Sequence, residues 1–289
     1  MPERSMAGGS AAERRLGVIG SPIGHSLSPA LHRAAYRTLG LDWSYGRHEV
    51  REGGLEAFVD GLDRRWRGLS ATMPLKEEVA ALATGADRTV ELTGAANTLL
   101  LDGGRRIARN TDVAGVERAL RDAGADEVEH AVVVGAGATA RSVIVALDEM
   151  GLRGVTVLVR DPARALAVNA LADELGLELD LVDIANLRHV VDGTDVVAWT
   201  LPNGVPLPGE LALDGEPDAI ALDVTYSPWP GPLAAPWLAA GGRVASGRDM
   251  LLHQAVRQVR FFVSGQTESP LPDEDAVEAA MRAALPDAS

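Results

Sequence analysis

The sequence predicts an α/β protein of two domains: a mainly parallel N-terminal α/β domain and a doubly wound α/β domain after it. Two observations carry this prediction. Strand-like and helix-like segments alternate from Leu16 onward, an order typical of parallel sheets. An apolar run at 131–134 leads directly into a glycine-rich turn and a helical pattern, as in many doubly wound sheets. The length of 289 residues agrees, because single cores stop growing at about 250 to 300 residues.

The first half of the chain contains the elements of the N-terminal domain. We expect strands at 16–20, 43–50 and 69–73, and helices at 28–39, 55–62, 76–83 and 113–123. The first helix has the clearest start, because Ser28-Pro29 has the form of an N-cap followed by proline in the first turn. Gly40 would end this helix as a left-handed cap.

The second half repeats the alternation and then ends in helices. We expect strands at 131–134, 155–159, 179–182, 196–199, 219–222 and 243–245, a helix through Val143, Leu147 and Met150, and helical stretches between most of the later strands. Two final helices, at 250–263 and 273–285, are followed by no strand. They must pack against another part of the protein, and the N-terminal domain is one option.

Composition excludes several classes of protein. The 27 basic and 41 acidic side chains give a net charge of −14, which argues against binding to nucleic acid or an anionic membrane. The absence of cysteine excludes disulfides, thiolate metal sites and thiol nucleophiles. No apolar run reaches the roughly 18 residues of a membrane span. Residues 1–15 lack the apolar stretch of a secretory signal, so we expect a disordered tail there and a cytoplasmic protein.

The glycine-rich segment after the first strand of the second half has the pattern Gly-x-Gly-x-x-Ala. Gly135 allows a sharp bend, Gly137 allows the backbone to approach a pyrophosphate, and Ala140 keeps the helix close to the strand. The helix start at Ala138 and Thr139 would direct free N–H groups and a positive dipole end at the phosphates. The pattern alone is weak, but its position between a strand and a helix favours a dinucleotide over a structural turn.

The end of the following strand bears on the choice between NADP and NAD. In the Rossmann arrangement that this pattern indicates, an acid there binds the ribose hydroxyls of NAD, and an arginine meets the 2′-phosphate of NADP. Both residue types are present. Asp161 before Pro162 is explained structurally as an N-cap, whereas Arg160 and Arg164 have no such local role. NADP is therefore favoured, and NAD stays open.

Four short segments of the N-terminal domain carry more polar side chains than packing requires. They are Gly20 to Pro29 with Ser26 and Ser28, Ser70 to Lys76 with Thr72, Gly94 to Thr98 with Asn97, and Asn110-Thr111-Asp112. Strand ends and the loops after them are where ligands collect in open α/β sheets. Any one segment alone is most simply a solvated loop. Together, an ammonium, a carboxylate, two amides and several hydroxyls suit a small polyhydroxylated substrate.

Lys76 is the only lysine in the sequence, against 26 arginines. Hydride delivery to a carbonyl carbon builds negative charge on oxygen and requires a proton donor, and the reverse oxidation requires the same group as a base. Lysine can release its proton, whereas arginine, with a pKa above about 12, effectively cannot.

These motifs, in this order, resemble those of the shikimate dehydrogenase family from Leu16 to about Gly265. Besides the polar segments and the glycine-rich loop, the matching segments are Gly20–Pro29 with His32, Asp223–Pro228 and Gly247–Gln254. The resemblance implies reversible, NADPH-dependent reduction of 3-dehydroshikimate to shikimate in the biosynthesis of aromatic amino acids. It also implies that the last helices return to the first domain. The substrate-binding and catalytic domain would then comprise 16–116 and 252–289, and the NADP-binding Rossmann domain 117–251.

The same resemblance implies a role for each site residue. Lys76 and Asp112 would form the catalytic pair, in which Asp112 would orient the ammonium and stabilise its charge. Substrate would contact Ser26, Ser28, Thr72, Lys76, Asn97, Asp112, Tyr226 and Gln254. The cofactor would contact Gly135, Gly137, Ala138, Thr139, Ala140, Arg160, Arg164, Thr200, Gly247 and Met250. No metal is expected, because His25 and His32 lack ligand spacing and companion acids. The expected partner is a small-molecule substrate, and the expected state a monomer or homodimer.

Three segments depart from the usual family pattern. Ser70-Ala71 stands where Asn-Val is usual, Val159-Arg160-Asp161 where Asn-Arg-Thr is usual, and Ala198-Trp199-Thr200 where Asn-Ala-Thr is usual. These departures leave open a relative that uses NAD with quinate or an amino-shikimate. Trp199 lies either near the nicotinamide or in the core.

Two further alternatives are weaker. A dinucleotide-binding protein without catalytic activity is disfavoured because Lys76 and Asp112 are both present. A folate-type dehydrogenase of similar two-domain shape is disfavoured because the paired serines and Gln254 suit a polyol acid.

Overall fold

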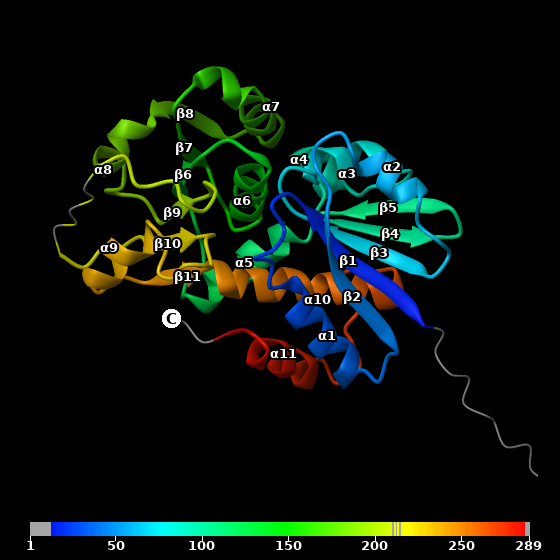
Figure 1. The fold of residues 1–289 in the computed structure, drawn as a ribbon. Helices are drawn as coiled ribbons and strands as arrows, with labels where there is room; N and C mark the ends of the chain where they lie inside the picture. Colours follow the sequence, from blue (N-terminus) through cyan, green and yellow to red (C-terminus); the bar gives the residue numbers. More distant parts are fainter. Residues whose placement is uncertain (1–12, 210, 212, 214, 287–289) are drawn as a thin grey trace, which may run out of the picture.

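The structure is a computed structural model that describes residues 13–209, 211, 213 and 215–286, apart from the side chain of Arg164. It contains two β-sheets side by side, each covered by helices (Figure 1). This confirms the predicted α/β fold class. The predicted tail at 1–15 was too long, because the first strand, β1 (Arg14–Gly20), begins at Arg14, where it pairs with Trp43 of β2 (Trp43–Glu49). Residues 1–12 of that tail lie outside the described part of the chain.

The first sheet has five strands in the order β2-β1-β3-β4-β5. The strands are β1 (Arg14–Gly20), β2 (Trp43–Glu49), β3 (Trp66–Ala71), β4 (Thr98–Asp102) and β5 (Arg105–Arg109). Strands β1, β2 and β3 are parallel, whereas β4 and β5 form an antiparallel hairpin that was not predicted. Its turn consists of Gly103 and Gly104, both in the left-handed region with φ of 57° and 85°. The first sheet is therefore mixed.

The helices around this sheet follow the predicted positions, with one addition. They are α1 (Ser28–Thr38), α2 (Leu55–Asp60), α3 (Lys76–Leu82), α4 (Arg88–Thr93) and α5 (Asp112–Asp122). Helix α4 was not predicted. The N-cap assigned to Ser28 was wrong: Ser28 is the first residue of α1, and Leu27 at the cap position has no side-chain hydrogen bond to the helix. The hydroxyl of Ser28 is thereby left for another role.

The second sheet has six parallel strands in the order β11-β10-β9-β6-β7-β8. They are β6 (His130–Val134), β7 (Gly154–Val159), β8 (Glu178–Asp183), β9 (Val196–Trp199), β10 (Ile220–Asp223) and β11 (Val244–Ser246). The covering elements are α6 (Ala138–Asp148), η1 (Pro162–Ala165), α7 (Leu166–Leu175), η2 (Ile184–Asn186), α8 (Leu187–Val190) and α9 (Ala234–Ala239). The strand order reverses between β6 and β9, which is the point where a doubly wound sheet opens a crevice for ligands.

The last two helices return to the first sheet. Helix α10 (Gly247–Ser264) packs along α5 and contacts β3 and β4, and α11 (Glu274–Ala283) packs on α1. Phe262 of α10 and Met281 of α11 share a hydrophobic cluster with Leu16 of β1 and Leu31 of α1. In Figure 1, α10 extends in orange from one sheet to the other. Of the two predicted domain boundaries, 116/117 falls within α5 and 251/252 falls within α10.

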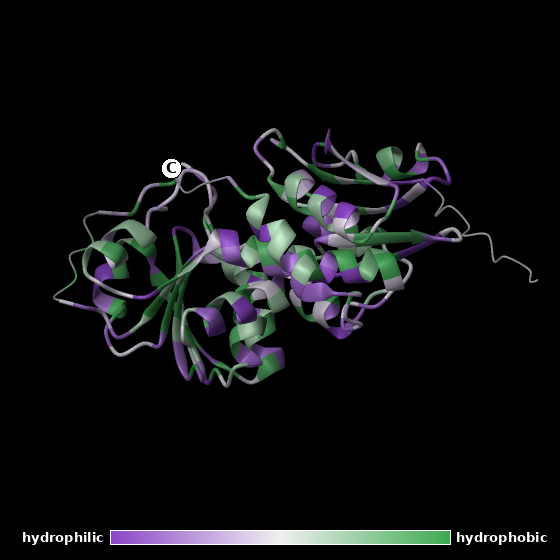
Figure 2. Cartoon of the chain, turned by 90° about the horizontal axis from the view of Figure 1, so that it is seen from below, coloured by the Kyte–Doolittle hydropathy of each residue, from purple (hydrophilic) through white to green (hydrophobic). Residues whose placement is uncertain are grey.

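Hydrophobic residues occupy the strands and the helix faces beside them, while the outer loops are largely hydrophilic (Figure 2). Each sheet has a separate cluster of buried apolar side chains on either face. In the second sheet this double burial explains the continuous apolar runs of its central strands. Among the described helices, none is both long and apolar enough to cross a membrane.

Candidate active site

Two adjoining cavities open between the carboxyl ends of the two sheets. The larger has a volume of about 840 Å³ and lies over the glycine-rich loop, and the smaller, of about 400 Å³, lies over β1 and β3. Both are lined by Thr72, Met73, Lys76, Thr139, Thr200, Leu201 and Pro202. A dinucleotide in the first and a small polar molecule in the second would therefore meet at this shared wall.

Lys76 and Asp112 form an ion pair at the shared wall. Lys76 Nζ lies 2.6 Å from Asp112 Oδ2 and 3.2 Å from Thr139 Oγ1. The side chains of Lys76 and Asp112 are 13% and 7% exposed, so little water competes for the contact. Lys76 is the first residue of α3 and Asp112 the first of α5. Each side chain therefore projects from a helix start beside the carboxyl end of the first sheet.

The amide of Asn97 holds the other oxygen of this carboxylate. Asn97 Nδ2 donates to Asp112 Oδ1 at 2.8 Å and to Gln254 Oε1 at 3.2 Å. Its Oδ1 accepts from the Thr111 backbone N–H at 2.9 Å, which fixes the orientation of the amide. Asn97 is 2% exposed. The carboxylate predicted at Asp112 is therefore held by Lys76 of α3 and by Asn97, which lies directly before β4.

All eight residues predicted to contact substrate line the smaller cavity: Ser26, Ser28, Thr72, Lys76, Asn97, Asp112, Tyr226 and Gln254. Ser26 Oγ accepts the backbone N–H of Ser28 at 3.3 Å, so the two hydroxyls lie together. Burial raises the pKa of the Tyr226 phenol, which keeps this group protonated, although Arg47 nearby acts in the opposite direction. Polar groups from four loops and from the helices α1, α3, α5 and α10 thus converge on one cavity.

Two further residues line the smaller cavity: Ser70, which was part of a predicted polar segment but had no predicted role, and Gln258, which was not predicted. Gln258 Nε2 donates to the Asn97 carbonyl at 3.0 Å, so its Oε1 must accept, and it does so from Ser70 Oγ at 2.7 Å and from His32 at 3.1 Å. Burial lowers the pKa of His32 to about 3, so His32 is neutral. A sequence signal for Gln258 existed, because it lies four residues after Gln254 on the same helix face.

The glycine-rich loop has the shape that the sequence predicted. Gly135 has φ of 110°, and a Cβ there would lie 2.7 Å from Thr200 Oγ1, so glycine is required. A Cβ on Gly137 would meet no atom within 4 Å, which leaves its backbone open to a phosphate. Ala138 and Thr139 begin α6 and line the larger cavity. Ala140 instead lies fully buried in the core, where it packs α6 on the sheet.

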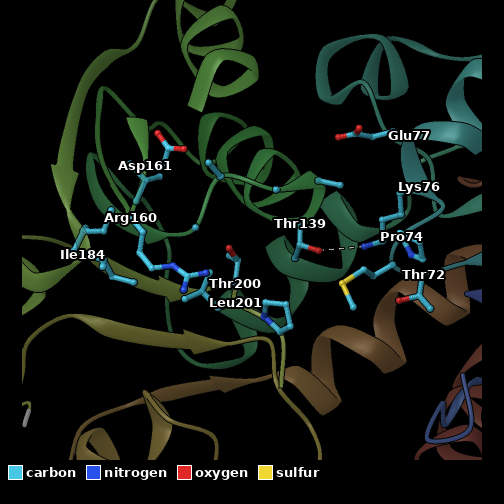
Figure 3. A pocket seen from close by; sticks show the side chains of 18 residues that line it. Thr72, Pro74, Lys76, Glu77, Thr139, Arg160, Asp161, Ile184, Thr200 and Leu201 are labelled. Carbon is cyan, nitrogen blue, oxygen red and sulfur yellow. Dashed lines mark hydrogen bonds between the residues drawn. The ribbon is translucent and has the colours of Figure 1, made fainter. Parts of the chain in front are cut away.

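Arg160 and Asp161 line the larger cavity at the end of β7 but serve different purposes (Figure 3). Asp161 Oδ1 accepts the Ala163 backbone N–H at 3.0 Å and caps η1, as predicted. Within the described ranges, the Arg160 guanidinium makes no hydrogen bond or ion pair, so it is available to an anion. The side chain of Arg164 lies outside the described residues.

The remaining predicted cofactor residues lie near the shared wall. Thr200 lines both cavities and donates to the Val134 carbonyl at 2.7 Å, whereas Gly247 and Met250 line the smaller one. Trp199 is fully buried in the core and lines neither cavity, which supports its packing interpretation. Among the described side chains no cluster of potential metal ligands occurs.

Two protein-family descriptions match the chain. "Shikimate dehydrogenase substrate binding domain" matches residues 18–99, and "Shikimate / quinate 5-dehydrogenase" matches residues 117–201. A shikimate dehydrogenase (NADP(+)) from Methanothermobacter thermautotrophicus is 34% identical over 93% of this chain and 96% of its own length. One from Thermus thermophilus is 35% identical over 94% and 98%.

Solved structures show the same similarity. The crystal structure of Mycobacterium tuberculosis shikimate dehydrogenase is 36% identical, with a TM-score of 0.77 over 94% of this chain and 100% of that one. A Thermus thermophilus shikimate 5-dehydrogenase in complex with NADP(H) and shikimate is 34% identical, with a TM-score of 0.77 over the same shares.

Proposed function

The chain belongs to the shikimate dehydrogenase family, and on this premise we propose that it catalyses the reversible, NADP-dependent interconversion of 3-dehydroshikimate and shikimate. One observation carries the proposal: the only lysine of the chain is paired with Asp112 at 2.6 Å, where a cavity suited to a dinucleotide meets a smaller polar cavity. A proton donor at that junction is what carbonyl reduction requires.

The residues of the chain supply the acid–base part of this reaction. The cofactor, when bound, would supply the hydride as NADPH in the reduction and accept it as NADP+ in the oxidation. Lys76 Nζ donates a proton to the substrate oxygen as negative charge develops there, and takes it back in the oxidation. Asp112 holds the ammonium in place and stabilises its charge, and Asn97 holds Asp112. The low exposure of both side chains excludes most water from the proton transfer.

The larger cavity fits the dinucleotide, because Gly137 leaves open space beside the start of α6 and Arg160 offers an unengaged cation within the described part of the chain. We assign the phosphates to the loop from Gly135 to Thr139, and the 2′-phosphate to Arg160 together with Arg164. Thr200, Gly247 and Met250 would face the nicotinamide. Residues 117–251 would form the nucleotide-binding domain, and 16–116 with 252–289 the substrate domain.

The smaller cavity would hold the substrate. Its hydroxyl and amide groups, from Ser26, Ser28, Thr72, Asn97, Tyr226 and Gln254, match the hydroxyls and carboxylate of shikimate. A monomer or homodimer in the cytoplasm remains our expectation for the assembly and location of the protein.

The closest alternative is an NAD-dependent quinate or amino-shikimate dehydrogenase. Its first clue, Asp161, is weakened because this carboxylate caps η1. Its second clue remains: Ser70 stands where the family usually has asparagine, and the Ser70 hydroxyl is engaged by Gln258 and by Tyr45. The substrate side of this alternative therefore needs a direct test.

Initial rates with shikimate and quinate, each with NADP and NAD, test the function. We expect the highest kcat/KM for shikimate with NADP. A preference for quinate or for NAD would select the alternative, and the absence of turnover with all four combinations would contradict the proposed activity.

A further inference from the structure

Thr139 connects the nucleotide-binding loop to the catalytic lysine. It lies in the first turn of α6, beside the second sheet, and its hydroxyl accepts a hydrogen bond from Lys76 Nζ at 3.2 Å. Lys76 belongs to α3, beside the first sheet. Figure 3 shows this bond crossing the cleft between the two parts of the protein. A residue expected only to bind cofactor thus contacts the proton donor.

The bond determines where the ammonium directs its remaining hydrogen. A lysine ammonium has three N–H donors. With a single acceptor, the ammonium can still turn about that one hydrogen bond, so the directions of the other two N–H groups are not fixed. Asp112 and Thr139 together hold two of the three. The third N–H then has one direction available, which is what a proton donor to a fixed substrate oxygen requires.

The Thr139 hydroxyl also has a proton of its own to donate. It accepts from Lys76, and in the described part of the chain no residue accepts from it. Thr139 lines both cavities, so this proton can reach an oxygen of a bound dinucleotide. Donation to a phosphate or ribose oxygen would polarise the hydroxyl and strengthen its bond to the ammonium.

We propose that Thr139 is a positioning residue that couples occupation of the nucleotide loop to the orientation of Lys76. The proposal rests on the proposed function for the identity of the proton donor. Cofactor binding and proton transfer would then be linked through one hydroxyl, without movement of a domain.

The presence of a single lysine allows a direct test without turnover. Protein labelled with 13Cε-lysine gives one lysine NMR signal, that of Lys76. We expect the signal of ligand-free Thr139→Val and Thr139→Ala to differ from wild type, while Thr139→Ser stays close to it. Thr38→Val, which removes a hydroxyl that bonds to Ala34 in α1, is the matched control and should leave the signal unchanged. An unchanged signal in Thr139→Val and Thr139→Ala would overturn the proposal.

Coupling to the cofactor is measured by adding NADP to the same samples. The lysine signal should shift in wild type and in Thr139→Ser, and by less than half as much in Thr139→Val. An equal shift in Thr139→Val would show that the Thr139 hydroxyl does not couple NADP binding to the environment of Lys76.

Kinetics provide the third measurement. Thr139→Val should lower kcat for shikimate by about 10-fold, the scale of a misoriented acid–base group. It should also raise KM for NADP, because the bound cofactor loses the hydrogen bond from this hydroxyl. Thr139→Ser should restore most of kcat. A change in KM for NADP with an unchanged kcat in Thr139→Val would contradict the proposal. A Thr139→Ser variant as slow as Thr139→Val would contradict it as well. Because the NMR measurement needs no turnover, a failure of the proposed function and a failure of this coupling are distinguishable.

Discussion

At the scale of single residues, the composition of the chain already indicates Lys76 as a functional residue. A chain that uses arginine at every other basic position keeps one lysine, and chemistry explains why: arginine cannot release a proton near neutral pH. The structure places this lysine against Asp112 and Thr139, at the junction of the two cavities. Asp112 could be expected as a partner from the sequence, but Thr139 could not.

The first prediction concerns the proton of this residue. Lys76→Arg keeps the charge beside Asp112 but removes a group that can give up its proton, so kcat for shikimate should fall by about 10²-fold or more. NADP affinity, measured by fluorescence titration, should be unchanged. Near-normal turnover in Lys76→Arg would show that Lys76 is not the proton donor.

His32 yields a prediction about stability and pH. Its pKa is lowered to about 3 by burial in the folded protein, against an ordinary value of 6.5. The unfolded chain therefore binds the extra proton between these values, so stability is full above pH 6.5 and falls as the pH drops toward 3. The slope contributed by one such group is about 1.4 kcal/mol per pH unit.

Urea unfolding of wild type and His32→Phe at pH 7, 6 and 5 measures this contribution. His32→Phe should be less stable at pH 7, because Gln258 and Tyr36 lose a hydrogen-bond partner, but its stability should fall less steeply with pH. His48 and His253, whose pKa values are also lowered by burial, contribute a slope common to both proteins. Identical slopes would show that His32 is not the neutral buried group assigned here.

At the scale of elements, strong periodic segments were predictable and short irregular ones were not. The central strands of the second sheet and helix α10 carry long apolar patterns, and both were expected within a few residues of their bounds. The β4–β5 hairpin was missed although Gly103-Gly104 between two short runs is a hairpin signal. Ser28 was assigned as an N-cap because Pro29 follows it, but α1 begins one residue earlier than this assignment implies, at Ser28 itself.

Gly115 controls how closely α5 and α10 approach. A Cβ at this position would lie 2.8 Å from the Met250 carbonyl and 2.9 Å from Gln254 Cβ. Gly115→Ala should therefore lower the free energy of unfolding by about 1–3 kcal/mol, as overpacking does. Because α10 carries Gln254 into the smaller cavity, KM for shikimate should rise more than KM for NADP.

Gly85→Ala is the matched control, since a Cβ there meets nothing closer than the end of the Arg105 side chain at 4.0 Å. It should leave both stability and KM near wild type. An equal loss in Gly85→Ala, or an unchanged KM for shikimate in Gly115→Ala, would argue against this close approach as the feature that positions Gln254.

At the scale of the whole molecule, the two sheets are joined on the side away from α10 by two ion pairs of different character. The Arg141 side chain of α6 is 7% exposed and donates to the Thr93 carbonyl and to Glu77, both at 2.5 Å. Arg88 of α4 pairs with Glu174 of α7, and both side chains are more than half exposed. We expect the pair with the more buried arginine to contribute more to the free energy of unfolding.

Replacement of each arginine by methionine compares them. Arg141→Met leaves the Thr93 carbonyl without its donor and should lower the free energy of unfolding by about 1–3 kcal/mol. Arg88→Met breaks a pair screened by water and should cost about 0–1 kcal/mol. Urea midpoints measured side by side decide the question, and equal effects would show that burial of Arg141 adds nothing to the interface.

The sequence by itself determined the residue chemistry and the order of elements, because periodicity, turn residues and the glycine-rich loop act over a few neighbouring positions. It indicated the dinucleotide loop, the ammonium, its carboxylate and the two serines.

Only the tertiary structure decided which groups meet. Thr139 contacts a lysine 63 residues away, and Gln258 holds the carbonyl of Asn97 across 161 residues. Such contacts depend on how α10 packs against α5 and how α6 faces α3. Those arrangements follow from the summed packing of both sheets, which no local pattern encodes.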